Sequence, residues 1–170
     1  MNYSRNELIK TEATMNQMRN SLYILVRFME KNGIKNSTEI FRRMGRSIAR
    51  TYFNYWKPTD FIKISNLKDV ITTIYKNVLN STISIEINDT EKLVIVRDYK
   101  CALCKYQYDD VEIAGCEILL GMISEFISLI SKESTEPNSI FLDPIEVKES
   151  RANGNKSCLQ LYRYKISGEA

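Results

Sequence analysis

One segment of the sequence is apolar around almost its whole circumference when it is drawn as a helix. It runs from Asp109 or Asp110, either of which can cap the first turn, to about Ser131. Only a narrow stripe is small or polar: Glu117, Gly121, Ser124 and Ser128. A helix that is apolar on nearly every side must be covered by other elements, because no wide face can be left to water. The segment therefore predicts a central core helix that the rest of the chain encloses.

The first half of the chain predicts three amphipathic helices. Ser4 and Glu7 have the spacing of a capping box, and Gly33 can end the helix that follows. Asn36 can cap a second helix, which must stop before Pro58, and a third spans about 67–79. Their apolar faces recur at steps of three and four: Met15, Met18, Leu22, Leu25 and Met29; then Phe41, Met44, Ile48, Tyr52 and Tyr55; then Val70, Ile71, Ile74 and Val78.

Two β-hairpins flank the central helix. The hydrophobic period changes to two over 83–87, a turn follows at 88–90, and 93–96 read as the returning strand. Pro137 and Pro144 bound a loop, after which 145–149 and 158–166 form a second hairpin around Asn153-Gly154. The predicted fold is α+β, with three N-terminal helices, a β-hairpin, the central apolar helix and a terminal β-hairpin. With no internal repeat or linker, we expect one domain over residues 1–170.

Composition restricts the class of protein. The net charge of +3 in 170 residues is too small to indicate a nucleic-acid partner. Glutamates interrupt the most apolar run, so we expect no transmembrane segment. Four cysteines are too few for a secreted disulfide scaffold, which favours the cytoplasm. The chain has no histidine, the commonest general base, so we expect no enzyme.

The cysteines allow two interpretations. Cys101 and Cys104 have the spacing of a metal-binding pair, and Cys116 with Cys158 could complete a four-thiolate zinc site. Against this, there is no second closely spaced pair, and buried neutral thiols are common on apolar helices and strands. Redox chemistry at the pair is disfavoured because Cys101 follows an antiparallel hairpin rather than a βαβ strand. The prediction is buried thiols with no cofactor, and zinc is the alternative.

The second helix carries two further patterns. Arg42, Arg43, Arg46 and Arg50 could form a nucleic-acid patch, an interface for an acidic partner, or simply a solvated face, which the modest charge favours. Gly45 and Ala49 are spaced by four, which would let another helix approach closely, and Gly115 and Gly121 could do the same on the central helix. Ser47 resembles a nucleophile elbow but lies inside a helix and has no histidine to activate it.

Three stretches of the chain resemble a known superfamily. Residues 43–53 (RMGRSIARTYF) look like the Met-Gly-centred helix of the small Bet-type subunits of the TRAPP vesicle-tethering complex. Residues 116–123 (CEILLGMI) are similar to the central helix of those subunits and of the 4-vinyl-reductase-type ligand-binding domain. Residues 147–158 (VKESRANGNKSC) resemble the terminal hairpin of the latter domain, roughly Val-x-Glu-Cys-x-Ala-x-Gly-Asp-x-x-Cys. The likeness covers about residues 15–166 and suggests a prokaryotic, archaeal member.

Two departures limit what the resemblance carries over. Ser150 and Asn155 replace the cysteine and the acidic residue of the hairpin pattern, which weakens the case for a family metal or thiol site. The TRAPP subunits carry an acylated cysteine after their second helix, whereas residues 57–63 contain none, so covalent acylation is not expected.

The resemblance implies an α/β-plait with a four-stranded antiparallel sheet. It also implies a non-enzymatic domain that dimerises through its N-terminal helices or pairs with paralogous subunits. It would either serve as a scaffold for vesicle tethering or bind a small hydrophobic ligand. The first two helices would supply the interface: Met15, Met18, Leu22, Leu25, Met29, Met44 and Ile48. The first-helix stripe equally fits ordinary core packing. The ligand pocket would lie between the central helix and the first hairpin: Ile118, Met122, Phe126, Ile83, Ile85, Val94 and Val96.

Overall fold

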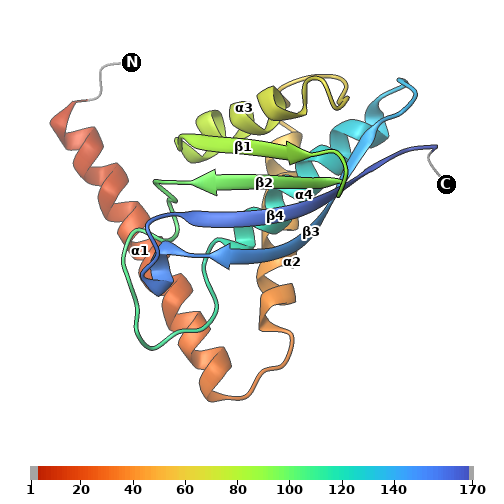
Figure 1. The fold of residues 1–170 in the computed structure, drawn as a ribbon. Helices are drawn as coiled ribbons and strands as arrows, with labels where there is room; N and C mark the ends of the chain where they lie inside the picture. The colour runs from red at the N-terminus through yellow and green to blue at the C-terminus, as the bar shows by residue number, and fades with distance from the viewer. Residues whose placement is uncertain (1–3, 169–170) are drawn as a thin grey trace.

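A computed structural model describes residues 4–168 of the chain, and its element order confirms the predicted α+β fold (Figure 1). No helix of this part is long and apolar enough to cross a membrane. The elements are α1 (Arg5–Lys31), α2 (Ser37–Phe53), α3 (Leu67–Leu79), β1 (Ile83–Asn88), β2 (Leu93–Asp98), α4 (Glu117–Glu133), β3 (Ile140–Glu149), the 3-10 turn η1 (Arg151–Asn153) and β4 (Cys158–Ile166).

The four strands form one antiparallel sheet in the order β1-β2-β4-β3. One face of the sheet lies in front of α4, with α2 behind α4 and α3 along the β1 side (Figure 1). Val94 and Val96 of β2 and Tyr162 of β4 are completely buried on the inner face. The hydroxyls of Tyr75 and Tyr162 both donate to Oε1 of Gln160, at 2.7 and 2.8 Å, so both buried hydroxyls are paired, whereas Nε2 of Gln160 has no partner within residues 4–168.

The glycines of α2 and α4 allow the two helices to touch through their backbones. A Cβ on Gly45 would lie 2.7 Å from the backbone nitrogen of Met122 and closer still to the carbonyl oxygen of Ile118. A Cβ on Gly121 would overlap the carbonyl of Arg42 in the same way. The close approach predicted from the small residues is therefore confirmed.

α1 begins at the predicted capping box, and its middle contacts the segment that joins β2 to α4. The capping box is present, with Ser4 Oγ accepting from the backbone of Glu7 at 3.3 Å and Glu7 Oε2 accepting from that of Ser4 at 2.7 Å. The N-terminal end of the helix projects beyond the sheet, while its middle lies beside the segment that joins β2 to α4 (Figure 1). We call this segment, residues 99–116, the β2–α4 loop; it contains no helix or strand.

The predicted start of the central helix is wrong. α4 begins at Glu117, with Cys116 in the N-cap position, rather than at Asp109 or Asp110. Asp110 instead makes a bidentate ion pair with Arg27 of α1, at 2.6 and 2.8 Å. The apolar residues before Cys116 belong to the β2–α4 loop and pack where they meet α1.

The last hairpin begins earlier than predicted. β3 starts at Ile140 and runs through Pro144, which was expected to bound a loop. Pro144 is tolerated because β3 is an edge strand and its register against β4 shifts between Pro144 and Glu146. Because the β3–β4 pairing is irregular next to Pro144, the missing backbone N–H of this residue does not interrupt a regular series of hydrogen bonds.

Candidate metal centre

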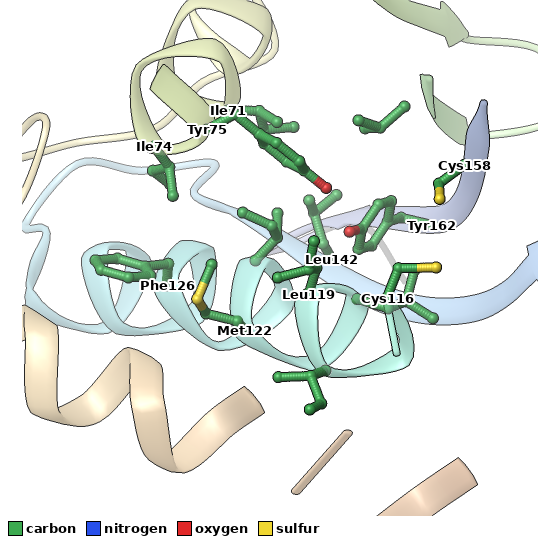
Figure 2. Close-up of a cluster of buried hydrophobic side chains, with 14 of the residues drawn as sticks. Ile71, Ile74, Tyr75, Cys116, Leu119, Met122, Phe126, Leu142, Cys158 and Tyr162 are labelled. Carbon is green, nitrogen blue, oxygen red and sulfur yellow. The ribbon is translucent and has the colours of Figure 1, made fainter. Parts of the chain in front are cut away.

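All four cysteines of the chain meet at one buried point. Their Sγ atoms lie within 4.8 Å of one another, and none of the four residues is more than 1% exposed. Cys101 and Cys104 lie in the β2–α4 loop, Cys116 precedes α4, and Cys158 is the first residue of β4. Figure 2 shows Cys116 and Cys158 at the edge of the hydrophobic cluster, beside Tyr162.

The fold brings these residues together through the ends of three elements. The β2–β4 ladder pairs Asp98 with Cys158, so the chain leaves β2 next to the start of β4. Three residues later it reaches Cys101, and a backbone hydrogen bond of 3.3 Å from Cys104 to Cys101 folds the pair into a tight turn. The loop then returns to the same point at Cys116. The sheet register therefore determines the position of the cluster, and the loop closes it.

The cluster fits a tetrahedral zinc ion. Zn–S bonds of about 2.3 Å place four thiolates about 3.8 Å apart, so the sulfur atoms would need to move inward by only about 1 Å at most. Four buried thiols with no carboxylate or imidazole among them form a soft, closed ligand set, which is typical of structural zinc sites. None of the four forms a disulfide.

Neighbouring polar groups point at the sulfur atoms. The backbone N–H of Arg151 donates to Cys158 Sγ at 3.4 Å, and the Tyr23 hydroxyl donates to Cys104 Sγ at 3.5 Å. Ser150 Oγ accepts from the backbone of Ala152 at 3.1 Å and lies 3.9 Å from the sulfur atoms of both Cys116 and Cys158. Donors of this kind stabilise thiolates and orient metal ligands.

The electrostatics single out one thiolate. Hydrogen bonds from the thiols of Cys101, Cys116 and Cys158 hold the pKa of Cys104 well below its ordinary value. The same contacts raise the pKa of Cys101 and of Cys116. Burial raises the pKa of Tyr23, so its hydroxyl stays protonated and remains a donor to Cys104.

A small polar hollow of about 150 Å³ lies on the surface near the cluster. Thr38, Glu117, Ser150 and Asn155 are among its lining residues. Ser150, which is almost completely buried, separates this hollow from Cys116 and Cys158. Ser150 is therefore the side chain that lies between the thiols and this hollow.

The predicted ligand-pocket residues lie in the packed interior. Five of the seven are buried: Val94, Val96, Ile118, Met122 and Phe126. Ile83 and Ile85 are half-buried at the side of the same cluster. Met122 and Phe126 face other side chains, among them those of α3 (Figure 2), and Phe126 makes edge contacts with Phe53 and Trp56. Of the seven residues, only Ile85 borders any of five hollows on the surface of residues 4–168.

The predicted interface residues divide into two groups. Leu22 and Met29 are buried within the chain itself and leave no surface for a partner, because they pack into the core. The others are exposed or half-exposed: Met15, Met18, Leu25, Met44 and Ile48. Large apolar side chains that were not among the predicted interface residues are also exposed on the same two helices: Ile24, Phe28 and Tyr52.

The arginines of α2 are largely engaged inside the chain. Arg42 pairs with Glu117 at 2.7 Å, Arg50 with Glu125 at 2.8 Å, and Arg46 with Glu39. Arg42 also donates to the carbonyl of Ile145 at 3.0 Å. These pairs leave α2 with much less free positive charge than its sequence suggests.

The side chains that surround the cysteines were not predicted from the sequence. Tyr23 lies on α1, far from the cluster in sequence, and Ser150 was considered only as a substituted cysteine. A signal for α1 was present, because Glu12, Asn16, Arg19, Tyr23, Arg27 and Glu30 recur at steps of three and four. Only the apolar stripe beside these residues was interpreted, as core or as a dimer interface.

Comparisons with known proteins support the fold. The sequence matches no protein-family model, and no curated protein matches it. Among solved structures, the chain is similar to a trafficking protein particle complex subunit 3 from Naegleria fowleri covalently bound to palmitic acid. The TM-score is 0.63 at 13% sequence identity, over 91% of this chain and 96% of that one. This likeness establishes a TRAPP-like fold.

Proposed function

We propose that the chain is a non-enzymatic assembly domain whose framework is held by one zinc ion bound to Cys101, Cys104, Cys116 and Cys158. The observation that carries this proposal is the meeting of every cysteine of the chain at one buried point, with sulfur atoms within 4.8 Å of one another. Three separate segments supply these ligands, so an ion there would tie together the β2–α4 loop, α4 and the sheet. A reducing compartment such as the cytoplasm would keep the thiols available.

Metal analysis of the full chain tests the zinc site. Protein purified without chelators should carry about one zinc per chain, and its melting temperature should fall when a chelator removes the ion. Cys104→Ser should lose most of the zinc, whereas Ser47→Ala, at an exposed position of α2, should keep it.

Two results would overturn the zinc site. One is metal-free protein whose four thiols all react with a thiol reagent after unfolding. The other is a non-reducing intact mass that has lost two hydrogens for each pair of cysteines, which would make the cluster a disulfide site instead.

The assembly role rests on the apolar side chains that α1 and α2 expose. Met18, Ile24 and Phe28 of α1 and Met44 and Ile48 of α2 are each more than a third exposed. Exposed apolar side chains that lie together on a surface mark a site that another protein covers. We propose a second copy of the chain as the partner, since a twofold pair lets the same apolar surface cover itself. The fold of the trafficking-complex subunit supports a scaffold of this kind, including a role in tethering vesicles.

The occupied interior favours a scaffold over a sensor of a small hydrophobic molecule. The prediction of a 4-vinyl-reductase-type, archaeal, single-domain protein stays open beside it.

Sedimentation analysis tests the assembly role. The full chain should form dimers that Phe28→Ser weakens, whereas Thr72→Ala, an exposed position on α3, should leave them intact. A monomer at all accessible concentrations would refute self-assembly.

A further inference from the structure

α1 is held to the molecule by a stripe of polar and aromatic side chains that all reach the β2–α4 loop. Lys105 pairs with Glu12, and Tyr106 donates to Asn16 at 3.1 Å. Arg27 pairs with Asp110, and Glu30 Oε1 accepts from the backbone of Glu112 and Ile113 at 2.9 and 3.3 Å. The six residues of the stripe are Glu12, Asn16, Arg19, Tyr23, Arg27 and Glu30. This α1 stripe is one continuous side of the helix.

The centre of the α1 stripe contacts the metal-ligand segment directly. Tyr23 is completely buried; its hydroxyl accepts from the backbone N–H of Gly115 at 3.2 Å while it donates to Cys104 Sγ. Its ring stacks on Tyr108, with ring centroids 4.0 Å apart. Tyr23 thus connects one ligand, Cys104, to the residue that precedes another, Cys116.

A second buried side chain contacts the loop between the paired cysteines. Arg19 is only 4% exposed, and its Nε donates to the carbonyl oxygen of Ala102 at 2.6 Å. Ala102 lies between Cys101 and Cys104, so the position of this carbonyl depends on how the two thiols are held. The hydrogen bond between α1 and the loop therefore depends on the conformation of the turn that contains Cys101 and Cys104.

The β2–α4 loop has no regular secondary structure of its own to maintain that shape. It carries three of the four proposed ligands, and the bonds to an ion would restrict it far more than hydrogen bonds between thiols do. Without an ion, the partners of Arg19 and Tyr23 would be free to move. An exposed apolar surface for assembly lies on the same helix, at Met18 and Phe28.

We propose that the zinc centre docks α1, so that zinc binding and self-assembly through α1 are coupled. This inference rests on the proposed function and adds its regulation. When zinc is bound, the β2–α4 loop binds the α1 stripe and holds the apolar surface of α1 in one orientation. When zinc is lost, α1 detaches from the loop and its apolar residues no longer form a defined surface. Coupling of this kind is reciprocal, so the dimer binds zinc more tightly than the monomer does.

Hydrogen exchange on the full chain tests the coupling. Chelation should speed amide exchange in residues 5–31 and 99–116 by roughly tenfold or more, the equivalent of losing one or two buried hydrogen bonds. Exchange in α2 and α4 should change much less, and the dimer should dissociate with the zinc. Unchanged protection of α1 in protein shown to have lost its zinc would overturn the coupling and leave the zinc site standing. Protein that never contains zinc would refute the proposed function instead.

A variant keeps the test valid if chelation unfolds the whole chain. Tyr23→Phe retains the ring that stacks on Tyr108 but loses both hydroxyl contacts. It should bind zinc in the normal ratio, lose α1 protection and dimerise more weakly. Tyr55→Phe, at a position beyond the end of α2 that is 86% exposed, is the matched control and should behave as the unaltered chain. Full α1 protection and unchanged dimerisation in Tyr23→Phe would overturn the proposal.

Discussion

The first two helices are attached to the same core by different means. α2 meets α4 through backbone contacts at Gly45 and Gly121, where no side chain separates the helices. α1 meets the β2–α4 loop through long side chains that bond to a carbonyl, a thiol and a carboxylate. The first contact depends only on the shape of two regular helices, whereas the second depends on the conformation of an irregular loop.

This difference teaches where a bound ion can have an effect. Close packing between helices is insensitive to ligands, because its atoms are already in contact. A loop that carries three thiols can change shape when those thiols bind or lose a metal. The comparison therefore predicts a rigid part, formed by α2, α4 and the sheet, and a conditional part, formed by α1 and the β2–α4 loop.

The largest effect should come from adding one methyl group to the rigid part. In Gly45→Ala the new Cβ would overlap the backbone of Ile118 and Met122, which cannot rotate away. We expect the free energy of unfolding to fall by about 3 kcal/mol or more. Urea unfolding measures it, and Ser47→Ala on the same helix should stay within about 0.5 kcal/mol of the unaltered chain. An unchanged midpoint for Gly45→Ala would mean that the two backbones are not in contact.

The next effect concerns the buried ion pair between the same two helices. Arg42→Met leaves Glu117, which is almost completely buried, without its cation, and removes a donor from the carbonyl of Ile145. We expect a loss of about 2 to 3 kcal/mol, because an unpaired buried charge is costly. Arg46→Met breaks the more exposed pair with Glu39 and should cost at most about 1 kcal/mol.

Adding Glu117→Met to Arg42→Met should recover much of the lost stability, since the uncompensated charge is then removed. A double variant as unstable as the single one would show that Arg42 acts through the β3 carbonyls rather than through the ion pair.

A smaller and more local effect is expected in the conditional part. Arg19→Met retains the apolar length of the side chain but removes its hydrogen bond to Ala102. The loss should be about 1 to 2 kcal/mol and should appear as faster hydrogen exchange in α1 and the β2–α4 loop. Asn20→Ala, at the neighbouring exposed position, serves as the control. Equal acceleration in α2 and α4 would show that the two parts do not open separately.

The smallest effect should be seen only through its pH dependence. The hydrogen bond from Arg27 lowers the pKa of Asp110 in the folded chain. A lowered pKa means that the pair stabilises the fold above the unfolded-state pKa of aspartate, and that this contribution is lost as the pH falls through the lower folded-state value. The melting temperature of Asp110→Asn should therefore be slightly lower at neutral pH, and the difference should vanish in acid. A difference that persists in acid would assign the effect to packing.

The candidate site was only partly predictable. The spacing of Cys101 and Cys104 indicated ligands, because two thiols separated by two residues can face one ion. Cys116 and Cys158 carried no such signal, since each lies at the start of an apolar element where a buried thiol is ordinary. The start of α4 was misplaced for a related reason: Asp110 has the right chemistry for a helix cap, but in the fold its carboxylate pairs with Arg27 of another helix.

The sequence by itself determined the elements and their order, because hydrophobic period and turn residues act over a few neighbouring positions. It also determined the close helix contact, because Gly45 and Gly121 leave room whatever lies opposite. Only the tertiary structure decided that four cysteines share one point, that Tyr23 reaches them, and that Leu22 and Met29 face inward while Met18 and Phe28 face outward. Those facts depend on sheet register and loop path, which join residues too far apart in sequence for any local pattern to connect.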